Sequence, residues 1–268
     1  MTEERDYREA AASFGAVADE YERGRPGYPD ELFDALERLW GRGLGGARVL
    51  DVGAGTGIAT RLLAGRGAEV VGVEPSAGMA ARFLASSPTV PLVRGTGDDL
   101  PFHDRSVDLV AYAQAFHWTR PERSVPEALR VLRPGGAIAA WWNVHDDGVP
   151  WVRARDRRMA AVLPGRYHGY RGIDGHVGHF ASAGLAVERT VLHWERRVTV
   201  DHVLTDLTSR SYVASLSPEE RAPVLAAERE AMLAEFPDGV VVEPFKVDLT
   251  VAVVPEHPEH PEHPEQPN

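Results

Sequence analysis

One Gly-rich turn constrains the fold of this chain more than any other segment. Residues 49–57 read Val-Leu-Asp-Val-Gly-Ala-Gly-Thr-Gly, an apolar run followed by glycines at every second position. Glycines let a backbone turn tightly and approach a ligand where a Cβ atom would clash. Dinucleotide sites favour Gly-x-Gly-x-x-Gly, whereas Gly57 here is followed by Ile58. Asp51, just before the glycines, would repel a pyrophosphate and suits a ligand with a cationic amino group.

Short β-branched runs alternate with helical stretches around and after this turn. The runs cover residues 47–53, 69–74, 90–94, 107–113 and 137–144. The helical stretches between them cover residues 58–65, 78–86 and 121–132. Strands alternating with helices of this length predict right-handed βαβ units and a parallel sheet covered on both faces.

The second half of the chain is less regular. A helical stretch at 151–162 precedes a strand at 187–198, and a final strand at 240–254 is interrupted by Pro244. We expect the two late strands to pair. The prediction is therefore an α/β fold with a doubly wound, mostly parallel seven-stranded sheet and a helical insertion before the last strand.

The expected insertion consists of helices at residues 201–216 and 218–236. Ser217 and Glu220, three residues apart, form a capping box at the start of the second helix. The insertion is either a lid over a site or a surface pair of helices, and the sequence leaves both readings open.

Composition limits the function and the partners. The chain has 268 residues, no cysteine and a net charge of −11, so we expect no disulfide, no thiolate site and no broad nucleic-acid-binding face. No apolar run reaches the roughly 20 residues of a membrane span, and the N-terminus has no apolar signal segment. A cytoplasmic protein without a membrane partner is the expectation. Its oligomeric state is left open.

The chain divides into four regions. We expect an N-terminal helical cap at 1–46, a ligand-binding core at 47–144, substrate-side helices with the last two strands at 145–254, and a Pro-Glu-His tail at 255–268. Proline at every third position of the tail blocks helix formation, so a disordered tail is favoured over a weak metal site on its histidines. No other spacing of histidines resembles a metal site.

Acidic residues lie near the carboxyl ends of three successive predicted strands. Asp51 lies near the end of the first, Glu74 is the last residue of the second, and Asp98 follows the third after Gly97. A carboxylate can accept hydrogen bonds from ribose hydroxyls or from an adenine amino group, although each acid alone also fits a helix cap or a turn. Because ligands bind at the carboxyl ends of parallel strands, the three together predict an adenosine site.

Four motifs together resemble the class I S-adenosylmethionine-dependent methyltransferases, in particular the methyltransferase type 11 group. They are DVGAGTG at 51–57, VEPS at 73–76, GDDLPFHDRSVDLV at 97–110 and LRPGG at 132–136. The resemblance implies a Rossmann-like fold, an S-adenosyl-L-methionine cofactor and methyl transfer to a small-molecule acceptor. The cofactor-binding residues that it implies are Asp51, Gly53, Ala54, Gly55, Gly57, Glu74, Pro75, Gly97, Asp98 and Gln114.

Two further segments resemble trans-aconitate methyltransferase-like enzymes, namely FGAVADEYERGRPGYP at 14–29 and AQAFHW at 113–118. Tyr21 and Trp118 offer π-faces for the cofactor sulfonium or its acceptor, and Arg25 can pair with the cofactor carboxylate. Ordinary packing is the alternative for both aromatic residues. His117 is the candidate catalytic residue, either as a general base or as an orienting donor, and a structural histidine is the third possibility.

The acceptor itself is not encoded in a recognisable motif. Trp142, with Trp141 and Asn143, lies at the carboxyl end of the fifth strand and is expected to face the pocket, although strand alternation alone would place one of the two tryptophans in the core. Tyr212 and Arg210 lie in the insertion. Such residues suit a small anionic or aromatic metabolite. A non-catalytic cofactor-binding protein remains an alternative, and a nicotinamide-dependent oxidoreductase is disfavoured by the glycine spacing.

Overall fold

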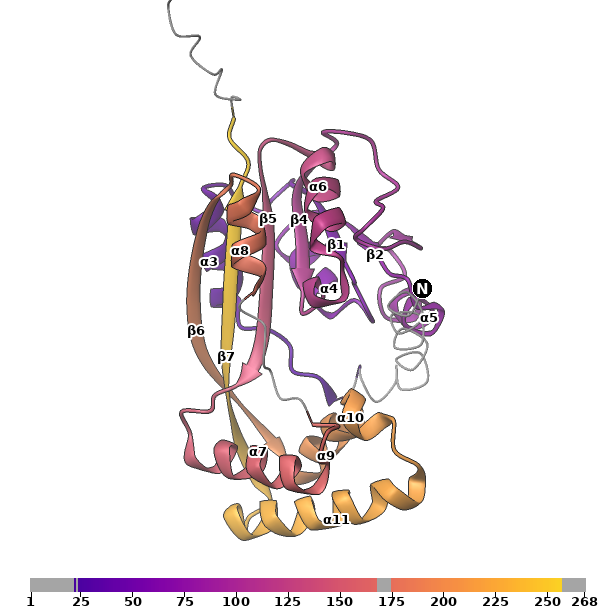
Figure 1. Cartoon of the computed structure of the whole chain (residues 1–268), viewed down its shortest axis with the longest axis vertical. Helices are drawn as coiled ribbons and strands as arrows, with labels where there is room; N and C mark the ends of the chain where they lie inside the picture. The colour runs from indigo at the N-terminus through magenta and orange to yellow at the C-terminus, as the bar shows by residue number, and fades with distance from the viewer. Residues whose placement is uncertain (1–21, 23, 168–174, 257–268) are drawn as a thin grey trace, which may run out of the picture.

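The sheet of this protein has seven strands in the order β3-β2-β1-β4-β5-β7-β6 (Figure 1). The computed structural model describes residue 22, residues 24–167 and residues 175–256. Neighbouring strands are parallel from β3 to β5, and β7 is antiparallel to both β5 and β6. The predicted α/β fold with a mostly parallel seven-stranded sheet is confirmed. The strands are β1 (Arg48–Val52), β2 (Glu69–Val73), β3 (Leu92–Val93), β4 (Val107–Ala113), β5 (Leu132–His145), β6 (Ala186–Thr199) and β7 (Val240–Val253).

Helices cover both faces of the sheet, because successive strand residues point to opposite sides. Val49 and Leu109 belong to one buried core, whereas Leu50 and Val110 belong to the other. The first core packs against α3 (Asp30–Trp40) and α4 (Ile58–Gly65), and the second against α6 (Pro121–Val131) and α8 (Gly175–Ser182). The central strands are therefore buried on both faces, which is why they read as continuous apolar runs. The helix α5 (Ala77–Ser86) follows β2.

A separate helical layer lies beyond the carboxyl end of β5 (Figure 1). It consists of α7 (Pro150–Val162), α9 (Val200–Thr208), α10 (Ser211–Ala214) and α11 (Pro218–Glu235). These helices share their own buried cluster, which includes Met159, Val203 and Met232 and reaches Val241 of β7. The last three of them form the helical insertion between β6 and β7 that the sequence predicts.

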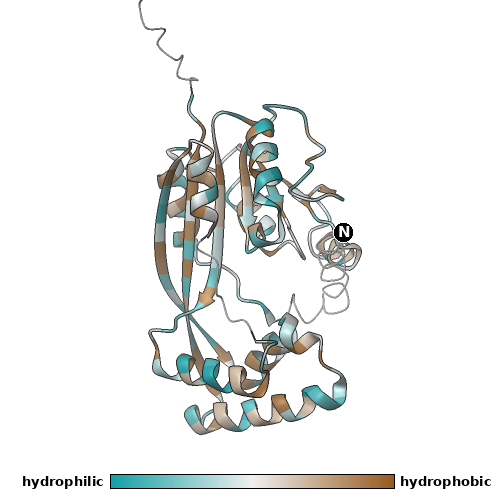
Figure 2. Cartoon of the chain, in the orientation of Figure 1, coloured by the Kyte–Doolittle hydropathy of each residue, from teal (hydrophilic) through white to brown (hydrophobic). Residues whose placement is uncertain are grey.

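The paired strands β6 and β7 carry the helical layer. Each is 14 residues long, and their pairing continues to Val240, past the point where β5 ends at His145. More buried and more exposed residues alternate along most of both strands, and both strands carry apolar and polar side chains (Figure 2), as expected where the two sides of a sheet are covered unequally. The projecting end of this pair holds the helical layer against the carboxyl edge of the sheet.

The expected interruption of the last strand at Pro244 is wrong, since β7 runs through it. The Pro244 carbonyl accepts a hydrogen bond from the Asp146 amide at 2.9 Å. The nitrogen and carbonyl of one strand residue point to the same side, so the Pro244 nitrogen also faces β5. The missing N–H therefore removes one bond where β5 ends and none from the ladder with β6.

Two element boundaries also differ from the prediction. The fifth strand begins at Leu132 instead of residue 137, because its pairing with β4 shifts register after Val107 and takes the Gly-rich turn into the strand as a bulge. The helix expected at 201–216 is split into α9 and α10 around Ser209 and Arg210. Predictions for residues 1–21 and for the tail after residue 256 lie outside the described residues.

The predicted capping box of α11 is confirmed. The Ser217 hydroxyl accepts from the Glu220 amide at 3.3 Å, and the Ser217 amide donates to Glu220 Oε2 at 2.9 Å. Two backbone amides that a helix start would leave unpaired are thereby satisfied. Within the described ranges, every helix is too short or too polar to cross a membrane.

Replacing Ser217 with alanine should lower the free energy of unfolding by about 1 kcal/mol, because the helix start loses a capping acceptor. Urea denaturation measures the change. Ser215→Ala is the matched control, since Ser215 is exposed and lies in the turn before the helix. Equal losses in the two variants would show that the cap contributes nothing.

Candidate active site

The strand order reverses between β1 and β4, and this opens a crevice at the carboxyl edge of the sheet. The helix after β1, α4, packs on one face, and the helix after β4, α6, packs on the other. The loops that leave these neighbouring strands therefore diverge to opposite sides. Open α/β sheets bind ligands at such a point.

The two loops approach each other closely at the floor of the crevice. Gly53 has a φ of +71°, and a Cβ atom added there would lie 2.6 Å from the Cβ of Ala115. Any larger residue would push the loops apart, so the first glycine of the motif is fixed by contact as well as by conformation. Gln114 also has a positive φ, 54°, and its amide donates to the Trp141 carbonyl at 2.8 Å.

Most of the predicted cofactor residues line one of two neighbouring hollows in this crevice. A cavity of about 110 Å³ lies beside a smaller recess, and the residues that line both include Gly53, Gly55 and Gln114. Gly57 instead begins α4 and packs against Phe83. Tyr21 lies outside the described residues. The predicted residues that line the cavity or the recess are Arg25, Gly53, Ala54, Gly55, Glu74, Pro75, Gly97, Gln114 and Trp118.

Asp51 lies at the end of β1, and its side chain is fully buried. Its Oδ2 accepts a hydrogen bond from the Thr60 hydroxyl of α4 at 2.5 Å. Its Oδ1 is also buried and has no hydrogen-bond partner among the residues that the structure describes. Burial, with a smaller contribution from the charge of Glu74, raises the pKa of Asp51 to about 6. A buried acceptor without a donor costs free energy, so this oxygen fits a ligand that brings a donor or a positive charge.

Glu74 joins the second strand to the glycine loop. Its Oε2 accepts from the Gly55 amide at 2.9 Å, and its Oε1 accepts from the Ser76 amide at 2.7 Å. Burial raises the pKa of this carboxyl, while the two amide bonds oppose the shift. Each carboxylate oxygen keeps a further lone pair, so Glu74 can hold the loop and still accept bonds from a ligand in the cavity.

The acid that follows β3 is held by a neighbouring arginine. Asp98 accepts from the Arg120 amide at 2.9 Å and from Arg120 Nε at 2.8 Å. Beside it, Gly97 lines the cavity, and a Cβ atom there would lie 3.1 Å from Val52. Gly97 thus forms part of the cavity wall, and Asp98 fixes the start of α6 behind it.

His117 lies on the short 3₁₀ helix η1 (Phe116–Trp118) that follows β4. The Trp142 indole Nε1 donates to His117 Nδ1 at 3.2 Å. Burial against its neighbours lowers the pKa of His117 to about 4, although part of the residue reaches solvent. The next residue, Trp118, is 37% exposed and lines the cavity.

The sequence led us to expect the tryptophans of β5 to face the pocket, but both lie in the core. Trp141 lies in the core against α3, where its ring is 5.9 Å from that of Tyr28, and Trp142 lies in the opposite core. Both are at most 2% exposed, because strand alternation places them on the two covered faces. Tyr212, in α10, contacts the Tyr167 ring at 5.0 Å inside the helical layer.

A strap formed by residues 24–28 crosses from the helical layer to the glycine loop. The Gly24 carbonyl accepts from Arg196 Nη2 and from His202 Nε2, both at 3.2 Å. The Gly27 carbonyl accepts from the side-chain Nδ2 of Asn143 at 3.1 Å. The strap residues Arg25, Pro26 and Tyr28 line the recess beside the glycine loop. The strap is therefore one wall of the candidate site.

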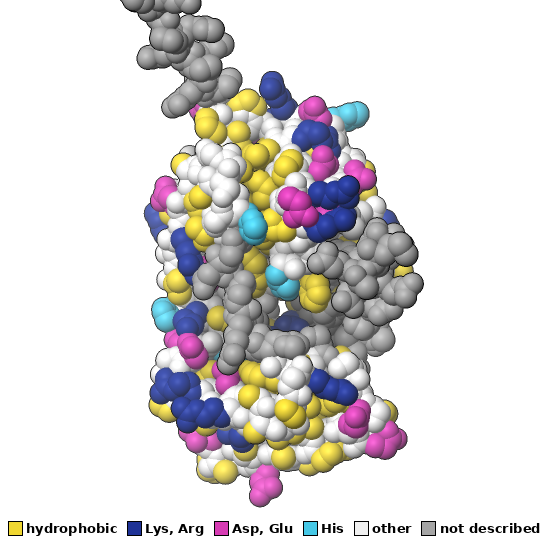
Figure 3. Space-filling view, in the orientation of Figure 1, with side chains coloured by type: hydrophobic (Ala, Val, Ile, Leu, Met, Phe, Trp, Pro, Cys, Tyr) yellow, Lys and Arg dark blue, Asp and Glu magenta, His cyan; other side chains and the backbone are white. Residues whose placement is uncertain are grey.

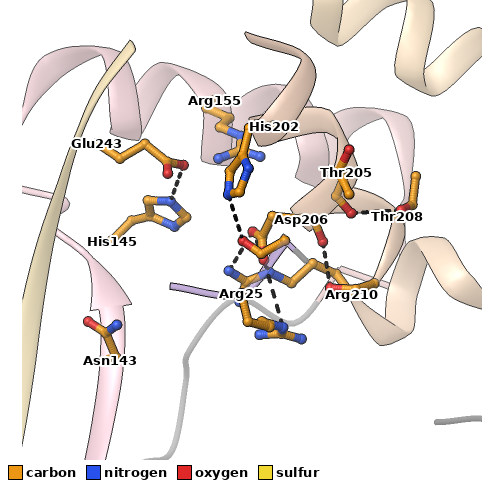
Figure 4. Close-up of polar contacts among 12 residues, drawn as sticks. Arg25, Asn143, His145, Arg155, His202, Thr205, Asp206, Thr208, Arg210 and Glu243 are labelled. Atoms are coloured by element: carbon orange, nitrogen blue, oxygen red, sulfur yellow. Dashed lines mark hydrogen bonds and ion pairs between the residues drawn. The ribbon is translucent and has the colours of Figure 1, made fainter. Parts of the chain in front are cut away.

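Buried charges tie this strap to the insertion, and sequence reasoning missed them. Asp206 of α9 is 1% exposed and lies 3.7 Å from Arg25 Nε and 2.7 Å from Arg210 Nη2 (Figure 4). Against the effect of burial, the two guanidinium groups hold the pKa of Asp206 well below its usual range. Beside it, Glu243 accepts from Arg196 Nε at 2.7 Å and lies 3.2 Å from His145 Nε2. The i, i+4 spacing of Asp206 and Arg210 was the one signal in the sequence.

Comparisons with known proteins agree with this site. The methyltransferase domain family matches residues 50–140. An uncharacterized methyltransferase of Mycobacterium tuberculosis is 36% identical over 234 residues, which cover 86% of this chain and 89% of that protein. The chain belongs to the class I S-adenosylmethionine-dependent methyltransferases.

Solved structures support the same fold for this methyltransferase. A type II methyltransferase candidate from Anaeromyxobacter dehalogenans superposes with a TM-score of 0.65 at 25% identity, covering 88% of this chain and 99% of that one. Phosphoethanolamine N-methyltransferase 2 of Haemonchus contortus, solved with S-adenosyl-L-methionine, gives a TM-score of 0.54 at 17% identity and covers 90% of this chain and 57% of that one.

Gly24→Ala should raise the dissociation constant for S-adenosyl-L-methionine about tenfold. A Cβ atom at Gly24 would lie 2.7 Å from the backbone of Asp206, so the strap must move away from α9 and from the glycine loop. Overpacking of this kind costs about 1–3 kcal/mol, and tenfold in affinity is about 1.4 kcal/mol.

Gly27→Ala is the matched control for this strap variant, because a Cβ atom there meets nothing within 4 Å. Isothermal titration calorimetry measures both affinities. If the two variants bind the cofactor equally well, the position of the strap does not matter for binding.

Proposed function

We propose that this methyltransferase transfers the methyl group of S-adenosyl-L-methionine to a small-molecule acceptor held between the sheet edge and the helical layer. The observation that carries the proposal is Asp51 Oδ1, a buried acceptor beneath the glycine loop that has no partner in the described part of the chain. The cationic amino group of the cofactor supplies the missing donor, directly or through one water.

The remaining residues of the crevice fit the other parts of the cofactor. The glycine loop from Gly53 to Gly55 leaves room for the methionine part. Glu74 keeps lone pairs for the ribose hydroxyls, and the small Gly97 leaves a flat wall for adenine. Asp98 lies behind that wall and acts indirectly in this proposal, since it binds Arg120 and fixes the start of α6. Arg25 borders the neighbouring recess, where the cofactor carboxylate would lie.

The bound cofactor supplies an activated methyl group, so the chain mainly has to align the acceptor and exclude water. Trp118 offers an apolar wall to the cavity, and the strap and α9 close the side toward the helical layer. Trp142 and Tyr212 do not touch the acceptor in this proposal. Trp142 contacts His117, and Tyr212 contacts Tyr167. Acidic and basic side chains are interspersed on the face shown in Figure 3, which favours a small acceptor over a polyanion.

Two measurements test the proposed function. Calorimetry should detect binding of S-adenosyl-L-methionine, and a methyl-release assay against hydroxylated and carboxylated metabolites should identify an acceptor. No binding of the cofactor would overturn the proposal. Binding without transfer to any member of a broad panel would favour a non-catalytic cofactor-binding protein.

The affinity for S-adenosyl-L-methionine should depend on pH through Asp51. Its pKa, raised by burial to about 6, means that the carboxylate is charged above pH 6 and protonated below it. The cofactor amino group stays cationic between pH 5 and 7 and binds the charged form. The association constant should therefore be nearly constant near pH 7 and fall toward about tenfold per unit well below pH 6.

Asp51→Asn should bind the cofactor more weakly and lose this pH dependence. Asp104→Asn is the control, because the Asp104 side chain is 73% exposed and pairs with Arg130 on the surface. A wild-type affinity that stays flat from pH 7 to pH 5 would remove Asp51 from the binding site.

A further inference from the structure

We infer that His117 serves as a hydrogen-bond donor to the methyl acceptor, and that Trp142 is the positioning residue that fixes it in this role. The inference rests on the proposed function for the place of the acceptor, but the state of the imidazole ring is testable without any substrate. The tautomer of this ring decides whether His117 can act as a base or as a hydrogen-bond donor, the two catalytic roles that the sequence leaves open.

The hydrogen bond between the two side chains determines which ring nitrogen carries the proton. Trp142 Nε1 lies 3.2 Å from His117 Nδ1. An indole nitrogen can only donate, so His117 Nδ1 is the acceptor and has no proton. A neutral imidazole with a bare Nδ1 carries its proton on Nε2.

The tryptophan is held too firmly to follow a rotation of the histidine. Trp142 is 2% exposed and belongs to the core beneath η1. Phe116, the residue before His117, is locked in the same core, with its ring 5.2 Å from Tyr112 and 5.0 Å from Phe180. The buried edge of the imidazole is therefore fixed on Trp142, and the Nε2 edge is the one that remains for solvent or a ligand.

The position of this edge suits an acceptor beside the cofactor. His117 is exposed, and its ring lies 4.9 Å from that of Trp118, which lines the cavity. Burial of the inner edge also keeps the ring neutral at pH 7, since the pKa of His117 is lowered to about 4. The group offered to the acceptor is a neutral N–H donor.

The fixed tautomer limits what His117 can do to the acceptor. The only basic lone pair of the ring is occupied by Trp142, so His117 does not remove a proton from the atom that is methylated. Its Nε2–H instead donates to an oxygen or nitrogen lone pair of the acceptor and orients it for in-line attack. The acceptor therefore carries a hydrogen-bond-accepting group close to the methylated atom.

Nitrogen-15 NMR of the histidine rings tests the tautomer directly. In the wild-type protein between pH 6 and 8, His117 should show an unprotonated Nδ1 and a protonated Nε2. Trp142→Phe keeps an aromatic ring but removes the indole donor, so the His117 tautomers should become mixed and its pKa should rise. A wild-type spectrum with an unprotonated Nε2 would overturn the inference.

The chain offers a matched control for this substitution at the adjacent residue. Trp141 is equally buried, on the opposite face of the sheet, and its Nε1 has no hydrogen-bond partner within the described ranges. Trp141→Phe should leave the His117 signals unchanged. If both substitutions shift them equally, the effect reflects general repacking of β5 and the inference fails.

Two variants of His117 separate a donor from a base once the panel has identified an acceptor. Glutamine places an amide donor near the position of Nε2 and cannot act as a base, whereas alanine removes both functions. In single-turnover reactions His117→Gln should stay within about tenfold of the wild-type rate, and His117→Ala should fall further below it. A general base would make both variants fall alike, by about 10²–10⁴-fold.

Cofactor affinity, measured by calorimetry in parallel, should be unchanged in both variants. Failure of the wild type to bind S-adenosyl-L-methionine would count against the proposed function and leave the NMR result on the tautomer standing. A loss of cofactor affinity in His117→Gln would place His117 in the cofactor wall and overturn its role toward the acceptor.

Discussion

The contact between the loops that leave β1 and β4 is the constraint on which the rest of the site depends. Gly53 and Ala115 meet with no space for another carbon atom, since a Cβ on Gly53 would lie 2.6 Å from that of Ala115. From this contact the chain departs to α4 on one face and to α6 on the other. The crevice, the buried Asp51 below it and the η1 turn beside it all follow from that divergence.

Two buried carboxylates near this crevice differ in their partners: one is paired within the protein, and the other keeps an oxygen for a ligand. Asp206 has two arginines as neighbours, at 2.7 and 3.7 Å, and burial of a charge is tolerated where such partners compensate it. Asp51 accepts from one hydroxyl at 2.5 Å, and its second oxygen has no partner among the described residues. The first carboxylate anchors the strap to the insertion, and the second is left for a ligand. Their opposite pKa shifts express the same difference.

Much of this arrangement could be predicted from the sequence because it depends on local patterns. Apolar runs of the right length predicted the sheet, and the spacing of Ser217 and Glu220 predicted the cap of α11. The glycine motif predicted a loop that does line the cavity. Pro244 was misread because its effect depends on where β5 ends, which is a property of a neighbouring strand.

The network around the strap could not be predicted, because its members are far apart in the chain. Arg25 contacts Asp206, and Gly27 contacts Asn143, because the folded sheet and the insertion bring these distant segments together. The protonation of His117 is also decided at a distance, by Trp142 on the adjacent strand β5. Alternation along β5 correctly places Trp141 and Trp142 on opposite faces of the sheet. It does not predict which of the two indoles donates a hydrogen bond.

In the proposed function, Asp51 Oδ1 receives the amino group of S-adenosyl-L-methionine. A crystal structure of the protein with this cofactor would show whether that contact forms. We expect the cofactor nitrogen about 2.7–3.2 Å from Asp51 Oδ1, or joined to it by one water, with the Thr60 bond retained. A cofactor bound in the crevice with its amino group elsewhere, and with Asp51 Oδ1 still without a donor, would contradict it.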